Sequence, residues 1–196
     1  MHFNVLYSLF VINGKVKELF YKNIVTMEKK DMNMKIILLN GPSSSGKSTL
    51  ASTLQTLIKD RTSEEYAIIS IDDFLQMATN DVIYEEDVFE ISSKLCDKSI
   101  EMLRLQQGVI IDHVITSERI FKQLIERLKL YNIYLVHVTC PLLELSKREE
   151  ERKNRYIGSA EASYEYLFPK EGYDLTVDTF VSSAKECSLQ ILDSMT

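Results

Sequence analysis

The sequence has no tryptophan, only three prolines and only three cysteines. The cysteines, Cys96, Cys140 and Cys187, lie far apart and form no Cys-x-x-Cys pair, which excludes a disulfide framework and a cysteine-based zinc site. This usage is typical of a reducing compartment, and we expect a cytoplasmic location. An excess of positive charge is also missing, because 23 basic and 29 acidic side chains give a net charge of −6. That balance argues against a dedicated nucleic-acid-binding protein.

No hydrophobic run is long enough to cross a membrane. The first twelve residues are apolar but interrupted by two polar ones, and no basic residue precedes them as in a signal peptide. We therefore expect no membrane partner. Residues 1–33 carry five lysines and three acidic residues, a net charge of +2 that leaves −8 for the remainder. Because the first well-formed element opens at Met34, we expect 1–33 to be a poorly ordered extension, or to lie upstream of the true start, and 34–196 to form one domain.

Short apolar runs alternate with amphipathic segments from Met34 onward, in a chain that is 45% hydrophobic. The apolar runs predict five buried strands, at 35–40, 66–71, 109–111, 133–138 and 175–177. Helical spacing of apolar residues predicts helices at 48–60, 85–107, 117–130, 142–155, 159–167 and 182–194. The alternation predicts a three-layer α/β fold, with a five-stranded parallel sheet and helices on both of its faces.

One loop carries the strongest chemical signal. Residues 41–48, Gly-Pro-Ser-Ser-Ser-Gly-Lys-Ser, match the phosphate-binding pattern G-x-x-x-x-G-K-[ST] between the first strand and the first helix. Such a loop points several backbone N–H groups at one place, and the helix behind it adds its positive end. We expect Lys47 to reach the β- and γ-phosphates and the Ser48 hydroxyl to bind Mg²⁺. The predicted nucleotide-binding residues are Gly41, Pro42, Ser43, Ser44, Ser45, Gly46, Lys47, Ser48 and Thr49.

The nucleotide is predicted to be ATP. GTP-binding switch proteins normally carry an N-K-x-D segment and a D-x-x-G segment, and neither string occurs in this sequence. Together with the phosphate loop, this favours a P-loop NTPase or kinase fold that uses ATP and Mg²⁺.

Two aspartates follow predicted strands at the edge where an open parallel sheet binds its ligands. Asp72 closes the second strand and Asp112 closes the third. Asp72 suits a base that accepts the proton of an attacking hydroxyl, and Asp112 suits a carboxylate that helps to hold Mg²⁺. Each position also suits the N-cap of the next helix, and Asp73 fits that role better than Asp72 does. The choice between Asp72 and Asp73 as the base is open here, and the neighbouring His113 is expected to be structural.

Three arginines lie on one face of the predicted 142–155 helix. Arg148, Arg152 and Arg155 stand at positions i, i+4 and i+7. Such a row suits a clamp that neutralises the phosphates during phosphoryl transfer. The alternative is a solvated helix held by ion pairs. Three pairs of opposite charge at i, i+4 support it: Glu144–Arg148, Glu149–Lys153 and Glu151–Arg155.

Together these motifs resemble the chloramphenicol phosphotransferase family, small P-loop kinases that phosphorylate a hydroxyl group of a small molecule. The resemblance covers nearly the whole chain from Met34. It includes Ile-Ile-Leu-Leu-Asn-Gly before the phosphate loop, and Val-Ile-Ile-Asp at 109–112. Its most specific parts are the segment from Val138 through the three arginines to Gly158, and the closing Tyr-Asp-Leu-Thr-Val-Asp-Thr at 173–179.

The resemblance implies that the phosphate-loop strand is central, that Asp72 is the catalytic aspartate, and that the arginine helix is a lid over the nucleotide. The chain departs from the family at His113, where a second aspartate is usual, and at Ser163 and Phe168, where glutamine and histidine are usual. The stretch between Asp72 and Asp112 is also shorter than in the antibiotic-modifying enzymes. Since that stretch should build much of the acceptor pocket, the resemblance implies kinase chemistry rather than chloramphenicol as the acceptor.

The sequence thus predicts an ATP-dependent phosphotransferase that acts on a small hydroxylated substrate. The residues expected to carry the chemistry are Asp72, Lys47, Arg148, Arg152 and Arg155, with Mg²⁺ held by Ser48 and Asp112. The alternatives of the same fold are a nucleoside, nucleotide or coenzyme-precursor kinase, and a non-catalytic nucleotide-binding module. The absence of arginine from 76–95 disfavours the first, and Asp72 disfavours the second. The sequence favours neither a monomer nor a homo-oligomer.

Overall fold

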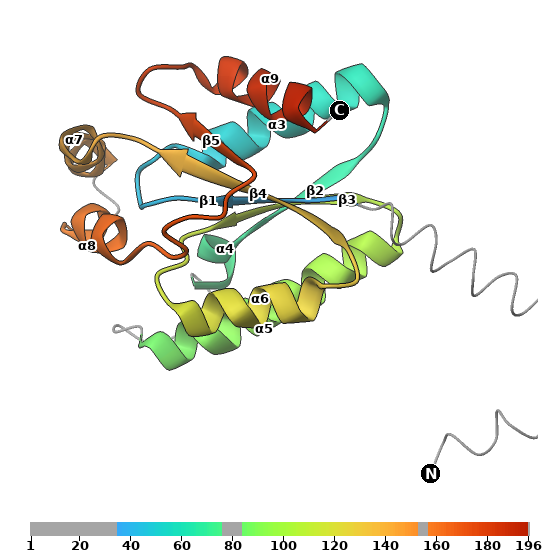
Figure 1. The fold of residues 1–196 in the computed structure, drawn as a ribbon, viewed down its shortest axis with the longest axis horizontal. Coiled ribbons are helices and arrows are strands. Elements are labelled where there is room, and N and C mark those ends of the chain that lie inside the picture. The colour runs from blue at the N-terminus through green and yellow to red at the C-terminus, as the bar shows by residue number, and fades with distance from the viewer. Residues whose placement is uncertain (1–34, 76–83, 153–156, 196) are drawn as a thin grey trace, which may run out of the picture.

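The computed structural model describes residues 35–75, 84–152 and 157–195. The predicted extension at 1–33 lies outside these residues, and so does Arg155. The described residues form three layers, in which a central sheet lies between two groups of helices (Figure 1). This is the predicted α/β architecture.

The central layer is a five-stranded sheet in which all neighbouring strands are parallel. The strand order is β2-β3-β1-β4-β5, so β1, which leads into the phosphate loop, lies in the middle. This confirms the expected position of that strand. The strands are β1 Lys35–Asn40, β2 Tyr66–Ser70, β3 Gly108–His113, β4 Asn132–Thr139 and β5 Leu175–Asp178.

Helices cover both faces of the sheet. The helices α3 and α9 lie on one face, α4, α5 and α6 lie on the other, and α7 and α8 stand beside the carboxyl ends of the strands (Figure 1). The helices are α3 Lys47–Thr62, α4 Ile71–Leu75, α5 Glu85–Arg104, α6 Glu118–Leu128, α7 Leu142–Arg152, α8 Ser159–Tyr166 and α9 Ala184–Ser194.

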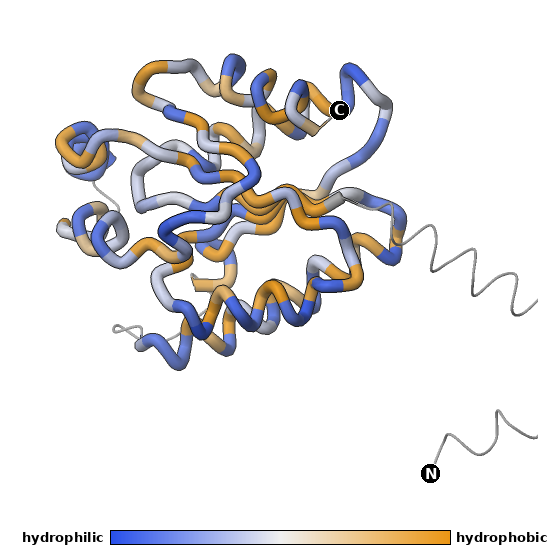
Figure 2. Tube along the Cα trace, in the orientation of Figure 1, coloured by the Kyte–Doolittle hydropathy of each residue, from blue (hydrophilic) through white to orange (hydrophobic). Residues whose placement is uncertain are grey.

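The central strand is hydrophobic on both sides because both of its faces are covered. Side chains alternate along a strand, so Ile36 and Leu38 join the core beneath α5 and α6, whereas Ile37 and Leu39 join the core beneath α3 and α9. All four side chains have no exposed surface. In Figure 2 the middle of the sheet is almost continuously hydrophobic, while α5 and α6 alternate between hydrophobic and hydrophilic residues. This pattern fixes the sheet and therefore the loops at its carboxyl edge.

One boundary differs from the prediction in a way that matters for the site. The strand β2 ends at Ser70, and Ile71–Leu75 forms the short helix α4, which the sequence analysis did not predict. The hydroxyl of Ser70 accepts a hydrogen bond from the backbone N–H of Asp72 at 3.3 Å, as a capping side chain does. The prediction that Asp72 closes a strand was therefore wrong, because this residue lies in the first turn of a helix.

All three cysteines, Cys96, Cys140 and Cys187, are buried and free. Among the described residues, no helix combines the length and the apolar character that crossing a lipid bilayer requires.

Candidate functional site

The phosphate loop runs from β1 into α3 and depends on two glycines. A Cβ atom on Gly41 would lie 2.2 Å from the backbone oxygen of Val138, so only glycine allows the loop to pass this close to β4. Gly46 has a φ angle of 86°, in the left-handed region, and forms the N-cap of α3. Ser44 also has a positive φ angle, 65°. These angles curl the chain so that residues 43–48 surround one point at the positive end of α3.

The inside of the loop is polar and buried. The side chain of Lys47 is 6% exposed, and its Nζ donates a hydrogen bond to the backbone oxygen of Pro42 at 2.9 Å. The hydroxyl groups of Ser43, Ser44 and Ser45 are also buried, and they have no hydrogen-bond partner among the described residues. Buried polar atoms are normally satisfied, so this set of donors fits a ligand that is rich in oxygen atoms.

Asp112, near the end of β3, places its carboxylate beside Ser48 in the first turn of α3. The hydroxyl of Ser48 donates to Oδ2 of Asp112 at 2.7 Å, and Asp112 is only 4% exposed. Mg²⁺ prefers a few protein oxygens together with water and phosphate oxygens, and this pair supplies one hydroxyl and one carboxylate. The residues present therefore fit the ion that the sequence predicted. Among the described residues, no group of three or more histidine, cysteine, aspartate or glutamate side chains forms another metal site.

One small cavity joins residues from four parts of the chain. Its walls combine the phosphate loop with the first turn of α4, the end of β3 and the last residue of α7. The lining residues are Ser43, Ser44, Gly46, Lys47, Ser48, Ile71, Asp72, Asp112, Val114 and Arg152. The structure thus brings together Lys47, Ser48, Asp72, Asp112 and Arg152, which the sequence placed in one site. Gly41, Pro42, Ser45 and Thr49 are not part of the cavity wall.

The two candidate bases differ in position. Asp72 is half-buried and lines the cavity beside the phosphate loop, whereas the neighbouring Asp73 is exposed and does not line it. Consecutive residues of a helix point about 100° apart, and of this pair Asp72 is the one that lines the cavity. The geometry therefore favours Asp72.

The two arginines that the structure describes have different contacts. Arg148 is paired with Glu144 at 2.9 Å, and its guanidinium also donates to the hydroxyl and the backbone oxygen of Thr179, both at 3.2 Å. Arg152 instead lines the cavity of the phosphate loop, and Arg155 lies outside the described residues. The ion-pair interpretation thus holds for Arg148, while Arg152 has the position that a phosphate clamp needs.

Thr179 supports the phosphate loop from behind, a role that the sequence analysis did not assign. Its hydroxyl donates to the backbone oxygen of Ser45 at 2.7 Å, and its N–H donates to the backbone oxygen of Thr139. Thr179 therefore connects Arg148 to the loop. The closing motif at 173–179 was the available signal, because it contains this residue.

Asn40, the last residue of β1, is a second support that the sequence analysis missed. Its Nδ2 donates to the hydroxyl of Tyr173 at 2.8 Å and to the backbone oxygen of Phe168 at 2.9 Å. Its Oδ1 accepts from the backbone N–H of Ile115 at 2.9 Å. Because the side-chain amide of Asn40 is buried and both its Nδ2 and its Oδ1 are hydrogen-bonded, it fixes the end of β1 directly before Gly41.

The helix α8 is held by a carboxylate of α7. Glu149 is 4% exposed, and its two oxygens accept from the backbone N–H groups of Gly158 and Ala160, at 2.8 and 2.7 Å. These are N–H groups at the start of α8 that have no partner inside the helix. The hydroxyl oxygen of Ser163 then accepts from the backbone N–H of Ser43 at 2.8 Å. Glu149 and Ser163 therefore join α7, α8 and the phosphate loop.

His113 has the structural role expected of it. Its side chain has no exposed surface, and its Nε2 lies 3.0 Å from the hydroxyl of Ser92 on α5. Burial lowers the pKa of His113 to about 4, so the imidazole is neutral near pH 7.

The chain is similar to known proteins in its family and in its fold. A family model described as chloramphenicol phosphotransferase-like protein matches residues 34–196. Among curated protein sequences no significant match is found. The fold resembles an APS kinase from Mycobacterium tuberculosis in complex with AMPPNP and APS, with 17% identity, a TM-score of 0.69, and 83% of this chain and 98% of that chain covered.

Two other solved structures show the same arrangement. A gluconokinase from Sinorhizobium meliloti is 16% identical with a TM-score of 0.62, and the match covers 84% of this chain and 92% of the other. A tunicamycin resistance protein from Deinococcus radiodurans is 18% identical with a TM-score of 0.61, over 83% and 96% of the two chains. These structures share the fold of the described residues.

Proposed function

The chain belongs to the chloramphenicol phosphotransferase-like family, and from this premise we propose that it is an ATP-dependent phosphotransferase with a small hydroxylated acceptor. One observation supports the proposal above the others. A phosphate loop, a carboxylate suited to act as a base, a metal-binding pair and an arginine line one cavity. A module that only binds nucleotides has no need of Asp72 in that position.

Binding of the nucleotide falls to the phosphate loop in this proposal. The loop N–H groups and Lys47 hold the β- and γ-phosphates, and Lys47 exchanges its bond to the Pro42 oxygen for phosphate oxygens. Ser48 and Asp112 are the residues that would hold Mg²⁺, which when bound neutralises phosphate charge. The AMPPNP in the structurally similar APS kinase agrees with an adenine nucleotide.

Transfer then requires a base on the acceptor side. The carboxylate of Asp72 accepts the proton of the acceptor hydroxyl while the acceptor oxygen forms a bond to the γ-phosphorus and the bond from that phosphorus to ADP breaks. The electron pair of the broken bond leaves with ADP. Arg152 lines the same cavity and neutralises charge on the transferring group, and α7 with α8 forms the arginine-bearing lid of the proposal.

Product analysis tests this function directly. The full chain is incubated with ATP, Mg²⁺ and a panel of hydroxyl compounds, and phosphorylated products are detected by mass. Transfer should be abolished in Lys47→Ala and kept in Lys59→Ala, since Lys59 is exposed on α3 and pairs with Glu65. Full transfer by Lys47→Ala would contradict the mechanism.

A further inference from the structure

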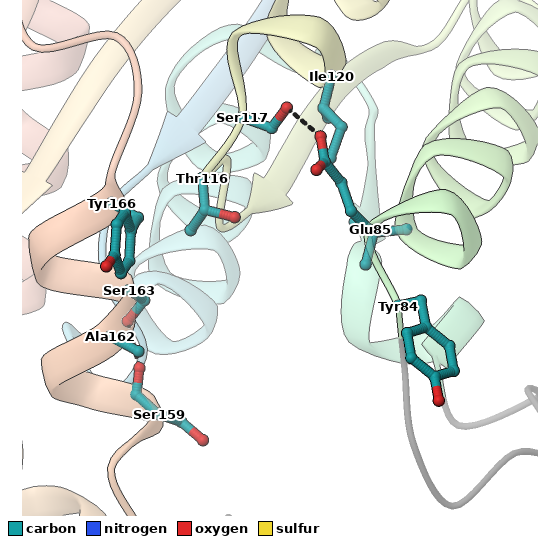
Figure 3. Close-up of a pocket in the computed structure, with 10 residues that line it drawn as sticks. Tyr84, Glu85, Thr116, Ser117, Ile120, Ser159, Ala162, Ser163 and Tyr166 are labelled. Atoms are coloured by element: carbon teal, nitrogen blue, oxygen red, sulfur yellow. Dashed lines mark hydrogen bonds between the residues drawn. The ribbon is translucent and has the colours of Figure 1, made fainter.

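A second cavity lies next to the phosphate loop. It has a volume of about 390 Å³ and opens between α8 and the first turns of α5 and α6 (Figure 3). Ser163 lines this cavity and also accepts the hydrogen bond from the backbone N–H of Ser43, which lines the phosphate cavity. The two cavities share the segment after β3 as well, because Val114 faces the first and Thr116 the second. The second cavity is therefore adjacent to the place where the γ-phosphate would lie.

The wall of this cavity combines hydroxyl groups with apolar and aromatic side chains. Thr116, Ser117 and Ser163 supply hydroxyl groups, and the ring of Tyr166 stands on the α8 side (Figure 3). Among the described residues that line it, Glu85 is the only charged one. No lysine, arginine or histidine contributes to the described wall, so an anionic ligand would find no opposite charge there.

The carboxylate of Glu85 is held in place at this wall. Its Oε1 accepts a hydrogen bond from the hydroxyl of Ser117 at 2.6 Å (Figure 3). The guanidinium of Arg119 does not line the cavity: it binds both carboxylate oxygens of Glu86, at 2.6 and 3.0 Å, and lies 3.8 Å from the ring centre of Phe89, with a weaker attraction to Glu85. The charge carried by the described lining residues is therefore negative.

We propose that this cavity binds the acceptor and that Glu85 selects acceptors without negative charge, whose hydroxyl or amino groups donate to its carboxylate. The proposal rests on the proposed function and names the acceptor class for it. Glu85 is exposed, so a carboxylate or phosphate of an acceptor beside it would meet a like charge, and no cationic residue among the described lining residues would offset that repulsion. A neutral or amino-bearing hydroxyl compound would instead satisfy Glu85 and place its apolar surface against Tyr166 and Ile120.

The first experiment compares acceptors of different charge. The full chain with Mg²⁺ and ATP is offered four sets of candidate acceptors. Three sets contain small molecules of similar size: neutral polyols, amino alcohols, and anionic compounds (hydroxy acids and sugar phosphates). The fourth contains short RNA with a 5′-hydroxyl. Phosphorylated products are expected only from the first two sets. Preferred transfer to a hydroxy acid, a sugar phosphate or RNA would overturn the selection by charge. No transfer to any set, with AMPPNP still bound, would contradict the proposed function itself.

The second experiment changes the charge at the cavity. Glu85→Lys should lower kcat/KM for the best acceptor by about tenfold or more and leave the KM for ATP unchanged, because a tenfold effect corresponds to loss of one good polar contact. Glu90→Lys is the matched control, since Glu90 is exposed on the same helix and does not line the cavity. Equal effects of the two substitutions would contradict a role for Glu85 in acceptor binding.

Discussion

The backbone N–H of Ser43 and the hydroxyl oxygen of Ser163 are 2.8 Å apart, and this buried hydrogen bond joins two segments that are 120 residues apart in sequence. Ser163 in turn donates to the backbone oxygen of Ser159 within α8. The position of α8 is thereby tied to the phosphate loop, and α8 also forms one wall of the proposed acceptor cavity. The hydroxyl group of Ser163 would therefore support both the nucleotide site and the acceptor site.

Removing this hydroxyl should weaken both stability and nucleotide binding. Ser163→Ala leaves the buried N–H of Ser43 without a partner, which should lower the free energy of unfolding by about 1–3 kcal/mol. Urea denaturation with and without AMPPNP measures both effects. Ser188→Ala is the control, because that hydroxyl only donates to a helix carbonyl of α9. A Ser163→Ala protein as stable as the control would show that the bond contributes nothing.

Asp72 and Asp73 offer a test of the base within one helical turn. Asp72→Asn should lower kcat by about 10²- to 10⁴-fold, because an amide cannot accept the acceptor's proton. Asp73→Asn should change kcat less than about twofold, since that side chain is exposed away from the cavity. Affinity for AMPPNP, measured by calorimetry, should be similar in both. The reverse order of activities would move the base to Asp73.

Arg148 and Arg152 should fail in different ways. Arg152→Ala should reduce kcat by about 10²-fold with an unchanged melting temperature, because its side chain reaches the phosphate cavity. Arg148→Ala should lower the free energy of unfolding by about 1–2 kcal/mol, because Thr179 and Glu144 lose a charged partner. Steady-state kinetics and denaturation of both variants separate the two roles. Matching profiles would indicate that the arginines act together after all.

Acid should destabilise the protein through His113. Its pKa is lowered to about 4 by burial, so between about pH 6.5 and pH 4 the unfolded chain binds a proton that the folded chain does not. Stability is therefore full above pH 6.5 and falls by up to about 3 kcal/mol as the pH drops towards 4. Denaturation at pH 7 and pH 5 should show a larger loss for the wild type than for His113→Gln. His137→Gln, which removes a less buried imidazole, is the comparison.

The sheet and the phosphate loop were predictable because their signals are local. A buried parallel strand such as β1 is written as a continuous apolar run, and the glycines at 41 and 46 occur at fixed spacing before Lys47. The helix α4 was missed because five residues are too few to show a helical period. Its start depends on the side chain of Ser70, which no periodicity records.

The supports of the site were less accessible to sequence analysis. Asn40 looks like the end of a strand, and only the fold shows that its amide meets Tyr173. Glu149 looks like one half of an i, i+4 ion pair, whereas in the structure both of its oxygens accept backbone N–H groups of α8. A side chain that binds backbone groups can have any residue type as its partner. The sequence therefore carries no sign of the contact, and only the three-dimensional structure shows it.

The contacts of Asn40 and Thr179 have a consequence for how the protein is made. They join the phosphate loop and the strand before it to residues 128 to 134 positions later in the chain. On the ribosome, the loop therefore emerges long before its supports do, and the site is complete only once β5 has been added to the sheet. Under the proposed function, ATP bound to that site would stabilise the finished fold over any shorter chain and so favour completed molecules.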